Sequence, residues 1–168
     1  MDLGAAPGGW SQVVSQMVGS KIHKPLVVAL DLLDIEDIPG VLAMKGDFLD
    51  LAVQEEIINI LSGKADVVMS DMAPNTTGER TTDHLRIMAL CEQAFDFAKN
   101  NLNHNGAFIA KIFQGGTEHT LLKEIKSLFK IVKHFKPQAS RQESSEMYLI
   151  ATGFKGAHLI DQIHETEL

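Results

Sequence analysis

Apolar and polar positions along the chain follow two alternating periods, and together they predict a series of strands and helices. Short apolar runs of strand length occupy residues 26–30, 41–44, 65–71, 106–113, 131–135 and 147–154. Apolar residues spaced by three and four predict helices over residues 51–61, 82–101 and 117–129. Thr82 or Asp83 can cap the long middle helix. Its predicted inner stripe comprises Ile87, Leu90, Ala94, Phe95, Ala98 and Leu102.

The order of these elements predicts an α/β fold. Nearly continuous apolar strands that alternate with helices are typical of a parallel sheet with helices on both faces. The last two strands follow each other after one loop, which predicts an antiparallel strand at one edge. No repeat or internal boundary is visible, so we expect one domain over residues 1–156 and a C-terminal tail over residues 157–168.

Composition narrows the class of protein. The 168 residues are 45% hydrophobic, and the mean hydropathy is +0.01, as in a soluble globular domain. No apolar run approaches the roughly 20 residues of a membrane span. Cys91 is the only cysteine and falls in a helical stripe, which predicts a packed core residue and excludes an internal disulfide. The seven histidines are scattered, so we predict no metal site, and we expect a cytoplasmic monomer.

Charge leaves the type of partner open. The net charge of −7 argues against a surface that binds nucleic acid throughout. The segment 123–141, however, holds six basic residues and a single acid, Glu124. This segment could form a local basic face, or its lysines could simply be solvated on one side of a helix.

The segment Asp2-Leu3-Gly4-Ala5-Ala6-Pro7-Gly8-Gly9-Trp10 predicts the end of a strand, a glycine-rich turn and the first turn of a helix. Small residues let a backbone approach a ligand closely, so this is a nucleotide-type cradle. It is neither the G-x-G-x-x-G fingerprint nor a phosphate-binding loop. Only three residues precede Gly4, whereas a central strand needs about five. We therefore expect a truncated first strand, with a start further upstream or a lost segment.

Acidic residues follow several predicted strands. Asp31, Asp47 and Asp71 each come at the end of an apolar run. Ligands of open α/β sheets bind beyond the carboxyl ends of the strands, so these side chains should meet at one edge. A carboxylate at Asp31 can accept hydrogen bonds from both ribose hydroxyls of a nucleoside. Asp47 could accept from an adenine amino group.

Lys111 is a lone charge inside the apolar string Phe108-Ile109-Ala110-Lys111-Ile112-Phe113. Lysine is rarely buried without a partner. It could be an outward-facing residue of an edge strand, or a desolvated lysine that acts as a base. The following Gln114-Gly115-Gly116 should end the strand near the ligand edge.

Three motifs resemble those of the FtsJ/RrmJ family of RNA ribose 2′-O-methyltransferases. They are Asp-x-Gly-x-x-x-Gly-Gly with Pro7 and Trp10, the turn Ser70-Asp71-Met72-Ala73-Pro74-Asn75, and Arg141-x-x-Ser144-Ser145-Glu146-Met147-Tyr148. The resemblance runs from Asp2 to about Lys155. It implies a Rossmann-like fold that binds S-adenosyl-L-methionine. The implied cofactor-binding residues are Asp2, Gly4, Pro7, Gly8, Gly9, Trp10, Asp31, Leu32, Asp47, Phe48 and Asp71.

The resemblance also implies the chemistry. The family's catalytic group consists of two lysines, an aspartate and a glutamate, and Lys111, Asp71 and Glu146 match three of these positions. The fourth, a lysine in a helix upstream of the glycine-rich turn, has no counterpart in this chain. Lys111 would act as general base. By resemblance to bacterial members, the substrate would be the ribose 2′-hydroxyl of a uridine in 23S rRNA of the large ribosomal subunit.

Two alternatives stay open at this point. One is a methyltransferase that acts on a base amino group or a small molecule. Methyltransferases that act on amino groups carry a [DNS]-P-P-[YFW] turn. The turn at Asp71–Asn75 lacks the second proline and the following aromatic residue, which argues against this class. The other is a folded but inactive fragment of the RNA methyltransferase.

Overall fold

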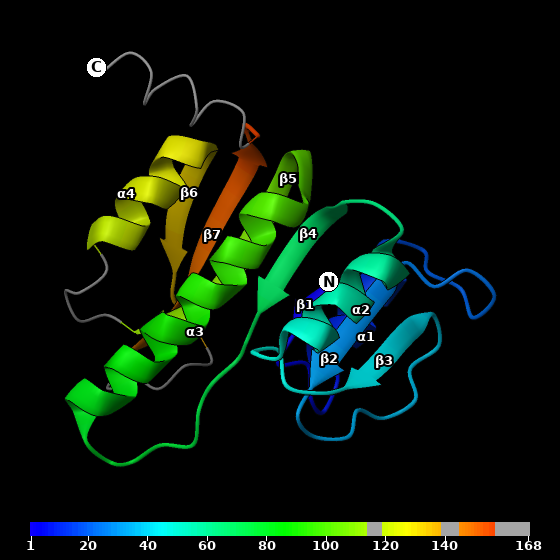
Figure 1. The fold of residues 1–168 in the computed structure, drawn as a ribbon, viewed down its shortest axis with the longest axis horizontal. Coiled ribbons are helices and arrows are strands. Elements are labelled where there is room, and N and C mark those ends of the chain that lie inside the picture. Colours follow the sequence, from blue (N-terminus) through cyan, green and yellow to red (C-terminus); the bar gives the residue numbers. More distant parts are fainter. Residues whose placement is uncertain (114–118, 139–144, 157–168) are drawn as a thin grey trace.

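The computed structural model describes residues 1–113, 119–138 and 145–156. These residues form a single seven-stranded sheet with the strand order β3-β2-β1-β4-β5-β7-β6 (Figure 1). The strands are β1 (Asp2–Leu3), β2 (Val27–Asp31), β3 (Val41–Lys45), β4 (Ala65–Ser70), β5 (Leu102–Phe113), β6 (Phe129–Phe135) and β7 (Glu146–Phe154). The helices are α1 (Gly9–Met17), α2 (Leu51–Leu61), α3 (Arg80–Asn101) and α4 (His119–Leu128).

The sheet is mostly parallel, as the alternation of strands and helices predicts. Strands β3, β2, β1, β4 and β5 pair in parallel, whereas β7 runs antiparallel to both β5 and β6. The predicted antiparallel element at one edge is therefore confirmed. From β1 the chain winds outward to β2 and β3 on one side, and later to β4 and β5 on the other. The crevice at the carboxyl ends of β1 and β4 is thus the switch point where such sheets bind ligands.

Helices cover both faces of the sheet. In Figure 1, α2, α3 and α4 lie in front of the strands and α1 lies behind them. Strand β5 shows the alternation clearly, because Phe108, Ala110 and Ile112 are buried, whereas Ile109 and Lys111 are only partly buried. The buried residues belong to a core that includes Phe95 and Cys91, so the prediction of a packed cysteine is confirmed.

The start of α3 differs from the prediction. The helix begins at Arg80, and its cap is Glu79, whose carboxylate accepts hydrogen bonds from the backbone N–H groups of Thr81 and Thr82. Asp83 does not cap the helix. Its buried carboxylate instead accepts hydrogen bonds from the backbone N–H and the hydroxyl of Thr77, both at 2.7 Å. Asp83 therefore ties the loop that follows β4 to the helix.

Several other boundaries shift by a few residues. Strand β4 ends at Ser70, and β5 begins at Leu102, which removes Leu102 from the predicted stripe of the preceding helix. That stripe also gains Met88, Cys91 and Phe97, while Leu90 is only partly buried. The predicted helix over 117–129 is α4, although residues 117–118 and the tail 157–168 lie outside the described residues.

Candidate active site

The glycine-rich turn places its backbone directly against the turn that follows β4. Gly4 has φ +72°, and a Cβ atom there would lie 2.7 Å from the backbone nitrogen of Met72. A side chain is therefore excluded at this position on two grounds, backbone conformation and space. The backbone N–H groups of Gly4 and Ala5 both donate to the carbonyl oxygen of Leu30, at 2.9 and 3.1 Å. These bonds fix the turn to the end of β2.

Helix α1 begins at the end of the same turn. Gly8 precedes its first residue with φ +121°, and a Cβ atom there would meet the side chain of Ile38 at 2.5 Å. Below the turn, the fully buried Asp2 accepts a hydrogen bond of 2.6 Å from the Ser11 hydroxyl. The other carboxylate oxygen of Asp2, Oδ1, has no hydrogen-bond partner among the described residues. Burial raises the pKa of Asp2, against the opposing effect of the Ser11 hydrogen bond.

A pocket of about 400 Å³ opens where the strands β1, β2, β3 and β4 end. This is the size of a small-molecule site. Six of the residues predicted to bind a cofactor line it: Gly4, Asp31, Leu32, Asp47, Phe48 and Asp71. The other predicted cofactor residues, Asp2, Pro7, Gly8, Gly9 and Trp10, do not line it. They lie on β1, in the glycine-rich turn and in the first turn of α1.

The two carboxylates on the β2–β3 side are held by the main chain. Asp31 accepts one hydrogen bond on each oxygen, from the backbone N–H of Ala6 and from that of Leu33, both at 2.8 Å. Asp47 accepts from the backbone N–H of Leu49 at 2.9 Å. Each carboxylate oxygen has two acceptor sites, so both groups keep capacity for a ligand. Asp31 and Asp47 therefore present hydrogen-bond acceptors to the pocket in fixed orientations.

Lys111 contacts Asp71, which is one of the residues that line this pocket. The Lys111 ammonium lies 2.9 Å from Asp71 Oδ1, and the side chains are 12% and 33% exposed. Strand β5 lies between β4 and β7, so the reading of Lys111 as an edge-strand residue is wrong. Asp71 both lines the pocket and binds Lys111. It therefore joins the candidate cofactor site to the candidate base.

Two residues of β7 complete this cluster. Tyr148 pairs directly with Lys111 across the antiparallel strands, and its hydroxyl donates to Asp71 Oδ1 at 3.0 Å. Burial raises the pKa of Tyr148 well above its usual value, with further contributions from Asp71 and from the charge of Glu146. Glu146 begins β7 two residues earlier, on the same face of the sheet. The motif resemblance predicts a role for Glu146 but none for Tyr148, although this sole tyrosine stands in the same motif.

Some predictions fall outside these contacts. Gln114-Gly115-Gly116, Arg141 and Ser144 lie outside the described residues. Among residues 1–113, 119–138 and 145–156, no three His, Cys, Asp or Glu side chains are grouped as metal ligands. Within the same ranges, every helix is too short or too polar to cross a membrane.

Comparison with known proteins identifies the group to which this site belongs. The family description "FtsJ-like methyltransferase" matches residues 1–154. The chain belongs to that family. This agrees with the motif resemblance and with the Rossmann-like arrangement of the sheet.

Curated relatives carry one common name. The chain is 54% identical over 157 residues to a "Ribosomal RNA large subunit methyltransferase E" of Azorhizobium caulinodans, which covers 94% of this chain and 65% of that protein. A protein of the same name from Rickettsia bellii is also 54% identical, over 92% of this chain and 69% of the relative. The chain thus spans about two thirds of the length of these relatives.

Solved structures share the architecture. A protein described as a ribosomal RNA methyltransferase from Plasmodium falciparum superimposes with a TM-score of 0.78 at 26% identity, covering 92% of this chain and 85% of the other. Human methyltransferase-like protein 13, solved in complex with SAH, gives a TM-score of 0.57 at 14% identity, over 90% of this chain and 69% of the other. The second likeness concerns the fold alone.

Proposed function

We propose that this chain transfers the methyl group of S-adenosyl-L-methionine to the ribose 2′-hydroxyl of a uridine in 23S rRNA of the large ribosomal subunit. One observation carries the proposal. Asp71 lines the pocket at the switch point and also binds the Lys111 ammonium at 2.9 Å. A methyl donor in the pocket and a base on the sheet would then be neighbours. The names of the curated relatives supply the class of substrate.

The pocket fits the cofactor on three counts. Gly4 leaves no room for a side chain between the glycine-rich turn and Met72, so a ligand can lie against the backbone itself. Asp31 and Asp47 offer acceptors for ribose hydroxyls and for an adenine amino group. Beneath the turn and outside the pocket lining, the buried Asp2 keeps an unused carboxylate oxygen that would favour a cationic ligand nearby. Of the remaining predicted binding residues, Leu32 and Phe48 would shape the walls, whereas Pro7, Gly8, Gly9 and Trp10 would hold the glycine-rich turn and the start of α1 in place.

Lys111 would serve as the general base. The bound cofactor supplies an electrophilic methyl group on a sulfonium, so neither a metal nor a covalent enzyme intermediate is needed. A ribose hydroxyl is a weak acid and must lose its proton as its oxygen gains the methyl group. The neutral Lys111 Nζ would take that proton, and the Asp71 carboxylate would then hold the resulting ammonium. A positioned base contributes typically 10²–10⁴-fold to the rate. Glu146 would add a further negative charge on the same face.

Because the proposed substrate is ribosomal, we infer that the protein acts in the cytoplasm, the compartment that holds ribosomes. We also infer that it acts as a monomer. The described basic residues of the segment 123–141 that are exposed, such as Lys133 on β6 and Lys136 just after it, could meet RNA phosphates. Phosphate contacts are the main source of affinity for nucleic acids.

The test is methyl transfer with labelled cofactor. Purified chain, tritium-labelled S-adenosyl-L-methionine and large ribosomal subunits that lack the modification are incubated together, and the RNA is digested to nucleosides. We expect the label on the 2′-oxygen of uridine. Label on a base amino group would instead support the base-modifying alternative. Calorimetry on the same preparation measures cofactor binding separately, so a chain that binds without transferring would retain only the first half of the proposal.

A further inference from the structure

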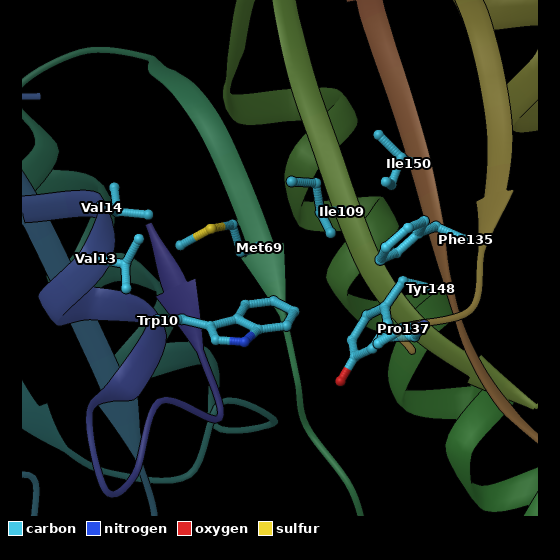
Figure 2. A pocket seen from close by; sticks show the side chains of 9 residues that line it. All are labelled: Trp10, Val13, Val14, Met69, Ile109, Phe135, Pro137, Tyr148 and Ile150. Atoms are coloured by element: carbon cyan, nitrogen blue, oxygen red, sulfur yellow. The ribbon is translucent and has the colours of Figure 1, made fainter. Parts of the chain in front are cut away.

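The sole tyrosine of the chain and its sole tryptophan form a ring pair at the candidate active site. The ring centroids of Trp10 and Tyr148 lie 5.2 Å apart with an interplanar angle of 50°. Figure 2 shows the two rings facing each other across an apolar groove on the α1 side of the sheet. The Tyr148 hydroxyl points away from the apolar side chains of the groove. It leaves the groove in order to reach Asp71.

Two donors share one oxygen at Asp71. Tyr148 Oη lies 3.0 Å and Lys111 Nζ lies 2.9 Å from the same atom, Asp71 Oδ1. Lys111 also donates to the backbone carbonyl oxygen of Asp71 at 3.4 Å. Lys111 lies on β5, Tyr148 lies on β7 and Asp71 directly follows β4, so no local motif could have brought them together.

We propose that Tyr148 is a positioning residue that fixes the Asp71 carboxylate, and through it Lys111, in the arrangement needed for proton abstraction. The inference rests on the proposed function, because it gives Tyr148 a part in the same reaction. Tyr148 itself does not line the pocket. It acts only through Asp71.

Tyr148 is more rigid than the ion pair that it contacts. A lysine side chain has four rotatable bonds, and the Asp71 carboxylate is one third exposed, so the ion pair alone leaves both partners free to rearrange. Tyr148 has only two rotatable bonds before its ring. Its position is set by the antiparallel register with Lys111 and by the Trp10 ring. A hydrogen bond from this rigid group restricts the carboxylate to one orientation. A misplacement of about 1 Å at a reacting group can cost 10²-fold in rate.

The protonation state of Tyr148 supports this role. Burial raises the pKa of the phenol well above its usual value, and the charge of Asp71, the hydrogen bond to it and the charge of Glu146 raise it further. The hydroxyl therefore stays a donor at every pH at which the protein works. Because the Trp10 ring belongs to the first turn of α1, Tyr148 also connects the catalytic cluster to the helix behind the glycine-rich turn.

The kinetic test separates the hydroxyl from the ring. Tyr148→Phe keeps the ring pair and removes only the donor, so we expect kcat to fall roughly 10-fold or more, as for the loss of a hydrogen bond to a charged group. The KM values for cofactor and RNA should stay within about 2-fold, since the pocket is untouched. Tyr148→Leu removes the ring as well and should also weaken cofactor binding through α1. Phe135→Leu is the matched control, because Phe135 is the cross-strand neighbour of Tyr148 on β6 and lines the same groove.

Wild-type kcat in Tyr148→Phe, or an equal loss in Phe135→Leu, would overturn the proposal. A spectroscopic test does not depend on turnover. Tyrosinate absorbance reports on Tyr148 alone, because the chain has no other tyrosine. After a rapid pH jump, the Tyr148 phenol of the Asp71→Asn variant should ionise at lower pH than that of the wild type. It should still ionise above pH 10, because burial is the largest cause of the raised pKa. Identical ionisation in both proteins would refute the contact with Asp71. If the wild-type chain binds cofactor but methylates nothing, the proposed function fails. The absorbance measurement then still decides whether Tyr148 contacts Asp71.

Discussion

The two halves of the candidate active site are built from different parts of the polypeptide. The cofactor half is made mainly of main chain. Gly4 abuts the backbone of Met72, and Asp31 is oriented by the N–H groups of Ala6 and Leu33. The catalytic half is made of side chains. Asp71, which directly follows β4, meets Lys111 of β5 and Tyr148 of β7.

This difference implies two kinds of sensitivity. A surface made of backbone has no functional group to remove, so it is damaged by added volume or by a change of backbone conformation. A cluster of side chains loses its chemistry when one group is deleted, even though the sheet that carries it stays intact. Substitutions that separate cofactor binding, catalysis and stability can therefore test the division between the two halves.

The largest effect should come from Lys111→Ala. Loss of the general base should lower kcat by roughly 10²–10⁴-fold. Cofactor affinity and melting temperature should change little, because Asp71 keeps the Tyr148 hydroxyl and is one third exposed to water. Single-turnover methyl transfer, calorimetry and thermal unfolding measure the three quantities. The matched control is Lys45→Ala, which breaks an exposed ion pair with Asp34 and should leave all three unchanged.

Retention of most activity in Lys111→Ala would contradict the assignment of this residue as the base. An equal loss of cofactor affinity would contradict the division itself, since Lys111 would then serve both halves.

The cofactor half was the easier one to predict from the sequence. Its turn is continuous in the chain, and glycine, proline and aspartate at fixed spacing encode backbone geometry directly. Asp31 and Asp47 follow from a general rule, because acids that end parallel strands collect at one edge of the sheet. Both residues line the same pocket, so this part of the site follows from features that are local in the sequence.

Other features depended on tertiary context. Tyr148 was missed because its role follows from the register between β5 and β7, which hydrophobic pattern alone does not determine. The start of α3 was misplaced because Thr82 and Asp83 are good capping residues in isolation. In the fold, Glu79 supplies the cap and Asp83 is used to hold Thr77. Competing polar groups cannot be ranked before the loop that brings them together is known.

The second prediction tests the backbone half. Gly4→Ala forces a side chain into a backbone with φ +72° and places its Cβ 2.7 Å from the nitrogen of Met72. We expect a loss of roughly 2–4 kcal/mol in the free energy of unfolding, from backbone strain and overpacking together. Cofactor affinity should also fall, because Met72 lines the pocket and must move. Chemical denaturation and calorimetry provide the measurements.

Gly9→Ala is the control for this experiment. A Cβ at Gly9 has no neighbour within 4 Å, and the residue is the first of α1, so the substitution should leave the free energy of unfolding nearly unchanged. Equal destabilisation by both substitutions would mean that glycine content, rather than the close approach to Met72, stabilises the turn.

A third substitution asks whether the cofactor half also relies on a charged group. Asp31→Ala should weaken cofactor binding by roughly 10–100-fold, as expected for the loss of hydrogen bonds to a carboxylate. The rate of the chemical step at saturating cofactor should be much less affected. Asp34→Ala, in the same connection but 87% exposed, is the control. Calorimetry on both variants decides, and equal affinities would remove Asp31 from the site.

The smallest effect should lie at the loop that joins the two halves to α3. Hydrogen bonds from Thr82 and Thr81 lower the pKa of Glu79 to about 2, from its usual value near 4.5. A carboxyl whose pKa is lower in the folded state stabilises the protein above its unfolded pKa. Its contribution is therefore complete above about pH 4.5 and is lost as the pH falls toward about 2. Since Glu79 is an exposed N-cap, we expect only a modest decrease in melting temperature over this window.

Glu79→Gln isolates that contribution. The amide oxygen can still accept a hydrogen bond from the first turn of α3, but it does not titrate. The difference in melting temperature between wild type and variant should therefore be largest near neutral pH and shrink between about pH 4.5 and 2. Asp83 titrates in both proteins, and its pKa is likewise lowered by the hydrogen bonds from Thr77, so its effect cancels in the difference. A difference that stays constant across this range would show that the cap does not depend on charge. Methyl transfer at neutral pH should be nearly unchanged, because Glu79 belongs to neither half of the site.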